Sequence, residues 1–411
     1  MPGGNATGVS PITTEPLCPS CRKVLRRWSH FFQPSSVVAM PVYIAKCYMK
    51  FTFLEFSEGI FPSLLMSSEP EGHYSRVLAH FFEQGRWGCP LETCLDEGQT
   101  LTAEDQLFIL MQAGLYLTAT RGTAAPEVRI CYERAESLCH SLNRPRLLYA
   151  ALIGQWRHSI QTDKLPATMQ IAKRVYSLAQ ERNDAGLMIG ACQALACTLC
   201  FLGDFETARR YAIRGVQMWR SGGLQPPVEE VSAPAVMCLC WEALSNSLLG
   251  EVTSSLPTMA EAIALAKELN DMYGLAAALN CAGIIGSLNR DAAEADRVAS
   301  DLIELSTRHL FAQWLAAGQP FRGWARSASG DPAEGISWIV DGTEDWRATG
   351  SKMCVPYWLA LKAEALYLSN RLSEALEANK RGGNTGRKIR GTLVVCRTAP
   401  ASRRVSHGFG C

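Results

Sequence analysis

The sequence lacks an excess of charge of either sign. It contains 40 Lys and Arg residues and 39 Asp and Glu residues, so the formal net charge is +1 over 411 residues. Proteins that bind nucleic acid or anionic membranes through their overall charge are basic, because cationic side chains neutralise phosphate groups. The composition therefore gives no general support for either partner. We expect no membrane association, and nucleic acid is an unfavoured partner.

The sequence also lacks a long unbroken apolar run and a signal sequence. A membrane-spanning helix needs about 18 apolar residues in succession. The most apolar stretch near the N-terminus, "SVVAMPVYIAKCYMKFTFLEF", is interrupted by Pro41, Lys46 and Lys50 and does not begin the chain. We therefore expect a cytoplasmic protein whose 16 cysteines, scattered through apolar stretches, stay reduced and fill core positions.

Motifs typical of catalysis or metal binding are missing as well. The seven His residues include no pair three or four positions apart, and no Ser/His/Asp or Cys/His set stands in a known motif context. "CPSC" (Cys18–Cys21) has the spacing of half a zinc site, but a structural zinc site needs four ligands and no second such pair follows. "GGNTGRKIRG" (Gly382–Gly391) has the residue types of a phosphate loop at the wrong spacing. We predict no catalytic residue, metal or cofactor.

What the sequence does contain is a repeated stripe of small residues. In "LGDFETARRYAIRG" (Leu202–Gly215), Ala208, Ala212 and Gly215 are spaced to line one face of a helix. The pattern recurs at intervals of 40 residues, with one longer step of 47 residues between the third and fourth repeats. The first residues of the seven stripes, which we call the anchors, are Val128, Thr168, Ala208, Ser255, Ala295, Gly335 and Ala375.

Each repeat is typical of two helices joined by a tight turn. In "SGDPAEG" (Ser329–Gly335), Gly330 suits the end of one helix, Asp331 can cap the next, and Pro332 fits its first position. Helix pairs with a fixed period of this size stack into an α-solenoid, and small residues let the stacked helices approach closely. We predict an all-α solenoid over residues 101–378, with Ser221–Glu230 as an inserted loop. An irregular helical domain does not account for the equal intervals. Turn residues stand five positions before several anchors, at Thr123 beside Gly122, Gly203, Gly250, Gly330 and Asn370.

The stripe resembles the tetratricopeptide (TPR) pattern, in which small or apolar residues occupy the same offsets of the second helix. The fold class is therefore a TPR-like α-solenoid of about seven helix-turn-helix repeats. Several phrases are similar to the TPR-like C-terminal repeat region of large bacterial predicted ATPases and adenylate/guanylate cyclase-type signalling proteins. They are "ATRGTAAPEV" (Ala119–Val128), "LGDFETAR" (Leu202–Arg209), "FRGWARSASGDPAEGI" (Phe321–Ile336) and "WRATGS" (Trp346–Ser351).

In that family the repeats follow an NTPase module, which often follows a cyclase, a kinase or a DNA-binding module. The resemblance covers about Leu101–Ala378, and the phosphate loop of the NTPase is absent from this sequence. The resemblance therefore implies a regulatory scaffold without catalytic activity. An NTPase or cyclase module is the partner expected in the parent architecture.

By analogy with TPR proteins, the first helix of each unit lines a concave surface that binds protein or peptide. We predict a non-catalytic protein-interaction scaffold. The first alternative is that the chain is part of an ATP-dependent signalling enzyme. The second is that it is a transcriptional regulator that binds nucleic acid. Trp219 and Trp346, each eleven residues after an anchor, are interpreted as packing residues between repeats. The candidate binding residues are Arg157, Gln193, Phe201, Asn280, Trp324, Tyr357, Glu364 and Tyr367.

The two ends of the chain fall outside the repeat. Residues 1–100 show no lasting helical period and are interpreted as an irregular leader. Residues 379–411 contain eight basic residues and no acidic one, which is the feature that favours nucleic-acid binding. Asn379 does not fit the stripe of small or apolar residues, so the last helix is expected to be about two turns long. The helix before it, around Tyr357–Leu368, is then expected to keep an exposed aromatic-rich face. One codon choice for "LVVCRTAPASRRV" (Leu393–Val405), read one nucleotide later, gives a phrase beginning Trp-Trp-Cys-Ala-Glu-Leu. We interpret this tail as frame-shifted, with a basic binding tail as the alternative.

Overall fold

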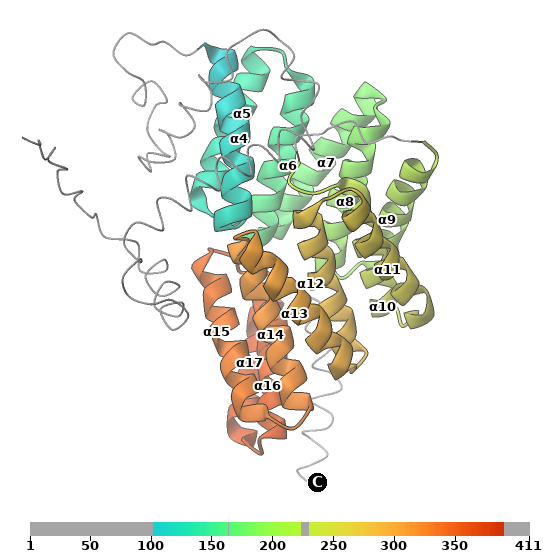
Figure 1. The fold of residues 1–411 in the computed structure, drawn as a ribbon. Helices are drawn as coiled ribbons and strands as arrows, with labels where there is room; N and C mark the ends of the chain where they lie inside the picture. Colours follow the sequence, from blue (N-terminus) through green and yellow to red (C-terminus); the bar gives the residue numbers. More distant parts are fainter. Residues whose placement is uncertain (1–101, 163, 223–229, 390–411) are drawn as a thin grey trace, which may run out of the picture. The chain divides into compact units, whose positions relative to one another are not determined.

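The computed structural model describes residues 102–162, 164–222 and 230–389, and all of them belong to one compact unit of the chain, Ser68–Cys411. Every regular element in these ranges is an α-helix, and the helices follow one another as seven pairs (Figure 1). The all-α repeat array predicted from the sequence is confirmed. The pairs are α4 (Ala103–Arg121) with α5 (Pro126–Ser141), α6 (Pro145–Gln161) with α7 (Leu165–Arg182), α8 (Ala185–Leu202) with α9 (Phe205–Arg220), α10 (Pro234–Leu248) with α11 (Val252–Glu268), α12 (Met272–Leu288) with α13 (Ala292–Arg308), α14 (Ala312–Ala328) with α15 (Pro332–Ala348), and α16 (Val355–Leu368) with α17 (Leu372–Ile389).

The repeated stripe lies on the second helix of every pair. All seven anchors are buried, and so are the residues four and seven positions later, except Asn379, which is half-buried. A Cβ atom added to Gly215 would lie 2.5 Å from Cys238 Sγ, and one added to Gly335 would lie 2.3 Å from the Gly323 carbonyl oxygen. Small residues are therefore required here because a neighbouring helix approaches closely, as the sequence predicts.

Residues with positive φ end the helices at regular intervals. The turns inside the pairs use Gly122, Gly203, Gly250, Gly330 and Asn370, as the sequence predicts. A second series, between one pair and the next, was not recognised from the sequence. Asn and Gly adopt this left-handed conformation at low cost, so they terminate helices. The second series contains Asn143, Asn183, Asn270, Leu310 and Gly350.

The connection between α9 and α10 is longer than the others. The residues described at its two ends, 221–222 and 230–233, are not helical, as expected for the inserted loop. Its C-terminal end is nevertheless part of the core. Val231 and Ser232 are buried, and the side chain of Glu230 is only 2% exposed. Glu230 is thus a loop residue, as expected, but its side chain is buried.

The last helix continues past the residue at which the sequence pattern fails. α17 has 18 residues and runs to Ile389, so the expectation of a helix about two turns long is wrong. Gly382 lies against α16, since a Cβ added there would be 3.1 Å from the Pro356 carbonyl oxygen. Most of α16 is buried, and of its residues Tyr367 and Leu368 remain exposed. The leader over residues 1–100, its "CPSC" motif and the tail over 390–411 lie outside the described residues.

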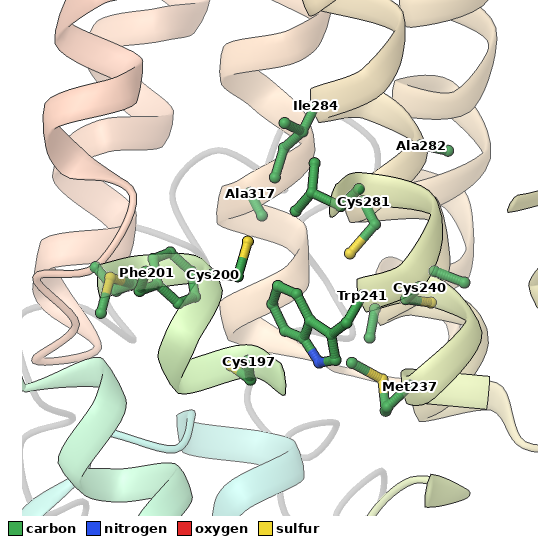
Figure 2. Packing of buried hydrophobic residues seen from close by; sticks show 14 of the residues in the cluster. Cys197, Cys200, Phe201, Met237, Cys240, Trp241, Cys281, Ala282, Ile284 and Ala317 are labelled. Atoms are coloured by element: carbon green, nitrogen blue, oxygen red, sulfur yellow. The ribbon is translucent and has the colours of Figure 1, made fainter. Parts of the chain in front are cut away.

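The described cysteines lie in the interior. All nine are free, eight are buried and Cys354 is partly buried. Four of them, from the helices α8, α10 and α12, belong to the same buried cluster as Trp241 and are labelled in Figure 2. Burial raises the pKa of Cys192 to about 11 and the pKa of Cys131 to about 12. These thiols therefore stay protonated and pack as small apolar groups, as predicted. The four cysteines labelled with Trp241 are Cys197, Cys200, Cys240 and Cys281.

One helix contradicts the expectation that no apolar run is as long as a membrane-spanning helix. α8 is long and apolar enough to cross a membrane by length and composition alone. In the structure 83% of that stretch is buried inside the protein, as is typical of a core helix.

The two tryptophans interpreted as packing residues do pack. The Trp346 ring lies 4.7 Å from the Trp358 ring in an edge-on arrangement, and Trp219 packs half-buried against the core.

Candidate functional site: the inner face of the first helices

From α6 to α16 the first helices of successive pairs pack on one another, and α14 also packs on α4. We call the surface that α4, α6, α8, α10, α12, α14 and α16 share the inner face. Trp241 of α10 lies between Phe201 of α8 and Cys281 of α12, and the rings of Phe201 and Trp241 are 5.8 Å apart (Figure 2). These side chains are buried, so they fill the space between the helices. The inner face is thus largely occupied by its own residues.

The structure places all eight candidate binding residues on first helices. Their burial differs from the expectation of an open concave surface. Tyr367 is 38% exposed, whereas the other seven are buried or half-buried. The physical reason is that the inner face packs on itself and on distant repeats. A role for these eight side chains in partner binding stays a prediction. Gln193, Phe201, Asn280, Trp324 and Tyr357 are buried, and Arg157 and Glu364 are half-buried.

Hydrogen bonds join repeats that are far apart in the sequence. The backbone N–H and the hydroxyl of Thr123 donate to Gln313 Oε1 at 2.8 and 2.9 Å, across 190 residues. The Lys352 N–H donates to the Gln161 carbonyl oxygen at 2.8 Å. In an open solenoid each repeat contacts only its neighbours. These bonds, which we call the closure contacts, join the first unit to the sixth, and the second unit to the connection between the sixth and the seventh.

Three of the candidate residues hold the fifth, sixth and seventh units together. The hydroxyls of Tyr357 and Ser287 lie 2.5 Å apart. Glu364 forms an ion pair with Arg290, whose guanidinium lies 5.8 Å from the centre of the Trp324 ring. These contacts give Trp324, Tyr357 and Glu364 a structural role in addition to any role in binding.

Arg157 lies at the centre of a buried polar cluster. Its Nη2 donates to Glu230 Oε2 at 2.9 Å, and its Nη1 donates to Ser232 Oγ at 3.2 Å. The Tyr149 hydroxyl donates to Glu230 Oε1 at 3.4 Å. The side chains of Arg157 and Glu230 are 12% and 2% exposed, so this ion pair is screened little by solvent. We call these four residues the Arg157 cluster.

A second carboxylate lies near the Arg157 cluster. Asp271 precedes α12 and accepts hydrogen bonds from the Gly274 and Ala233 N–H groups, both at 2.7 Å. Burial raises the pKa of Glu230, and the nearby Asp271 raises it further, while Arg157 lowers it. Burial also raises the pKa of Asp271, against the effect of its backbone donors and Arg157. The Arg157 guanidinium thus favours the charged form of both buried carboxylates, and Asp271 has two backbone donors as well.

Sequence reasoning missed Glu230, Tyr149 and Gln313. Glu230 fell in a segment assigned to a loop, and no pattern links it to Arg157. One signal was present, because Gly190 interrupts an apolar helix where Ala is favoured by about 1 kcal/mol. A Cβ added to Gly190 would lie 2.0 Å from the Tyr149 hydroxyl oxygen and 2.9 Å from Glu230 Oε1. The glycine therefore leaves room for the Arg157 cluster.

A shallow depression of about 240 Å³ on α9 is lined by Thr207, Arg210, Tyr211 and Arg214. Arg214 donates to the Tyr176 hydroxyl at 2.5 Å, so this side chain is partly engaged within the protein. No group of three or more His, Cys, Asp or Glu residues in the described part of the chain is placed to hold a metal ion.

No protein-family model and no curated protein matches the chain. Its structure is similar to that of a Rap protein complexed with Competence and Sporulation Factor, with a TM-score of 0.50 and 12% identity over 81% of this chain and 97% of that one. It is also similar to Aspartyl phosphate phosphatase F from Bacillus subtilis, with a TM-score of 0.50 and 13% identity over 86% and 95% of the two chains.

A third similar structure is a Signal Transduction ATPase with Numerous Domains that has a tetratricopeptide repeat sensor, from Pyrococcus horikoshii. Its TM-score is 0.38 at 16% identity, over 86% of this chain and 58% of that one. At identities this low the first two likenesses show the fold alone. With the seven helix pairs, they show that the chain is an all-α, TPR-like α-solenoid.

Proposed function

We propose that this chain is a non-catalytic, TPR-like scaffold that binds a protein or peptide through its inner face. The observation that carries the proposal is a set of buried polar atoms there without hydrogen-bond partners among the described residues. Gln193 Oε1, Trp241 Nε1 and Gln161 Oε1 are in this state. Buried polar groups in native proteins are almost always hydrogen-bonded. A peptide that displaces side chains of the inner face would supply the missing partners from its main chain.

The fold supports a role in binding. The Rap protein, which is similar over most of both chains, is described in complex with Competence and Sporulation Factor. A solenoid of this class presents an extended surface made by one helix from each repeat. The resemblance of the repeat phrases to bacterial signalling ATPases adds an NTPase or cyclase module as the protein partner, in the cytoplasm.

A peptide-display selection on the purified chain tests the proposal, with counter-selection on the Gln193→Leu variant. We expect enriched peptides that bind the parent chain, with an affinity at least about tenfold weaker for Gln193→Leu. The matched control is Gln217→Leu on the exposed side of α9, which should leave binding unchanged. Failure to enrich any peptide, or equal affinity for the parent and Gln193→Leu, contradicts the proposal.

An ATP titration by calorimetry separates the proposal from the first alternative. The non-catalytic scaffold should give no heat of binding. Clear micromolar binding of ATP by the purified chain would favour the ATP-dependent signalling enzyme instead.

A further inference from the structure

We infer that Arg157 forms a carboxylate-binding position on the inner face, that Glu230 of the same chain now occupies it, and that an acidic peptide partner binds there. The inference rests on the proposed function, because it names the chemistry of the peptide. It also assigns a regulatory role to Glu230, as an internal competitor for the partner's carboxylate.

The first observation is that packing of the repeats does not require a charge at position 157. Arg157 stands eleven residues before its anchor. At that offset the other units carry side chains that are mostly apolar, and Leu packs well in the first and fourth units. Burying a guanidinium and a carboxylate costs desolvation energy that a leucine does not incur. The residues at the equivalent positions are Leu117, Cys197, Leu244, Ile284, Trp324 and Glu364.

The second observation is the route by which Glu230 reaches Arg157. Other pairs are joined by short turns, such as the one from Glu268 to Met272, whereas α9 ends at Arg220 and α10 begins at Pro234. Glu230, four residues before α10, bonds to Arg157 of α6, which belongs to the second pair, although α9 and α10 belong to the third and fourth. The contact between Arg157 and Glu230 is therefore additional to the stacking of neighbouring repeats.

The third observation is that the groups around Arg157 suit any carboxylate, whether it comes from Glu230 or from a bound peptide. Arg157 Nη2 donates to one oxygen of the Glu230 carboxylate and the Tyr149 hydroxyl donates to the other, while Arg157 Nη1 donates to Ser232 Oγ. Gly190 leaves space beside the carboxylate oxygen. Charge-assisted bonds from Arg are the strongest that a carboxylate receives in proteins.

The fourth observation is that Glu230 is held imperfectly. Its bond from Tyr149 is long, at 3.4 Å, and the buried carboxylate of Asp271 lies close enough to oppose its charge. A peptide carboxylate that brings further contacts along the inner face can therefore compete with it. Substitution of Glu230 should increase the affinity for an acidic peptide because it removes the competitor.

The test uses the full chain, an N-acetylated oligoglutamate peptide and fluorescence anisotropy. We expect Glu230→Gln, which keeps the side-chain volume, to bind the peptide at least about tenfold more tightly than the parent chain. The matched oligoglutamine peptide should show no such gain. The double variant Arg157→Gln, Glu230→Gln should lose the gain, because the guanidinium is the receptor. Equal affinity of the parent and Glu230→Gln, or a gain that persists in the double variant, overturns the inference.

A second measurement does not depend on a peptide. In Glu230→Ala a small carboxylate can replace the missing one, so acetate should raise the melting temperature relative to acetamide at equal ionic strength. The parent chain, whose position is filled, should show no acetate effect. Absence of an acetate effect in a folded Glu230→Ala overturns the inference. A tyrosine-phosphate probe that binds better than oligoglutamate also overturns it, in favour of a phosphopeptide.

The outcomes show which of the two proposals is wrong. If display yields neutral peptides that depend on Gln193 and are indifferent to Glu230→Gln, this inference is wrong and the proposed function stands. If acetate stabilises Glu230→Ala but no peptide binds any variant, the scaffold proposal is wrong, and the inference fails with it in its peptide part.

Discussion

Single small residues set the distance between the stacked helices. Ala212 and Gly215 lie on the buried side of α9, and a Cβ added to Gly215 would collide with Cys238 Sγ at 2.5 Å. Interiors are packed too closely to absorb a large added volume. The same reasoning predicted these positions from the sequence, because a stripe of Ala and Gly on one face of an amphipathic helix indicates a neighbouring helix at close range.

The first prediction concerns Ala212→Trp. The substitution should lower the free energy of unfolding by about 1–3 kcal/mol, since there is no room for an indole beside the neighbouring helix. Urea denaturation followed by circular dichroism measures the change. Arg210→Trp, at an exposed position on the same helix, is the control and should be near neutral. Equal stability of Ala212→Trp and the parent would show that Ala212 is not at a packed contact.

The second prediction concerns His158, whose Nδ1 lies 3.1 Å from the Thr123 carbonyl oxygen. Burial lowers the pKa of His158 below its usual value of 6.5, and the bond to Thr123 opposes this shift in part. Protonated His158 is thus disfavoured in the folded chain, which binds fewer protons than the unfolded chain. The associated stability is present above pH 6.5 and is lost as the pH falls through 6.5 toward the lowered folded pKa.

Thermal melts of the parent chain and of His158→Asn between neutral and mildly acidic pH check this expectation. Asparagine keeps a donor toward Thr123 but does not titrate, so the variant should lose less stability on acidification. His140→Asn, at an exposed position, serves as the control. An unchanged slope in His158→Asn would mean that other groups account for the acid sensitivity.

At the scale of elements, the helix pairs and their turns follow from short-range sequence signals. Gly330 followed by Asp331 and Pro332 ends one helix and starts the next, and the Asp331 side chain does accept from the Glu334 N–H. The end of α17 could not be predicted in this way. Asn379 and the glycines that follow have low helix propensity, but packing of Gly382 on α16 outweighs it.

The third prediction concerns this last helix. A chain that stops after Asn379 should be less stable than one that stops after Ile389, because it leaves the backbone near Pro356 uncovered. We expect a lower melting temperature and a greater tendency to self-associate through the exposed apolar surface. Differential scanning fluorimetry and light scattering on both chains measure these effects. Identical behaviour of the two chains would show that residues 380–389 contribute nothing to the array.

At the scale of the whole molecule, the array contains long-range contacts that local sequence patterns do not predict. The sequence predicted the repeats, the small-residue stripe and the first helices as the inner face. It did not predict that the inner face is filled, since Thr123 and Gln313 are 190 residues apart and neither has an unusual context. The same holds for Arg157 and Glu230. The periodicity of the sequence predicts contacts between neighbouring repeats, whereas these contacts join segments that are not neighbours in the array.

The fourth prediction tests the closure contacts. Gln313→Ala leaves the buried Thr123 N–H without an acceptor, which costs about 1–3 kcal/mol. Hydrogen exchange of amides in α4, α5 and α14 should increase together, because the first and sixth units lose their contact. Gln217→Ala, exposed on α9, provides the control. Faster exchange confined to α14 would show that the bond does not couple the two units.

The closure contacts also limit how this chain can evolve. Repeat arrays commonly change length by duplication or loss of a whole unit, because each unit needs only its neighbours. Here the partner of Thr123 lies in the sixth unit and the partner of Gln161 lies just before the seventh. One unit more or fewer between them would displace both partners at once. The closure contacts therefore constrain the number of repeats. A descendant with six or eight units would have to form both contacts anew.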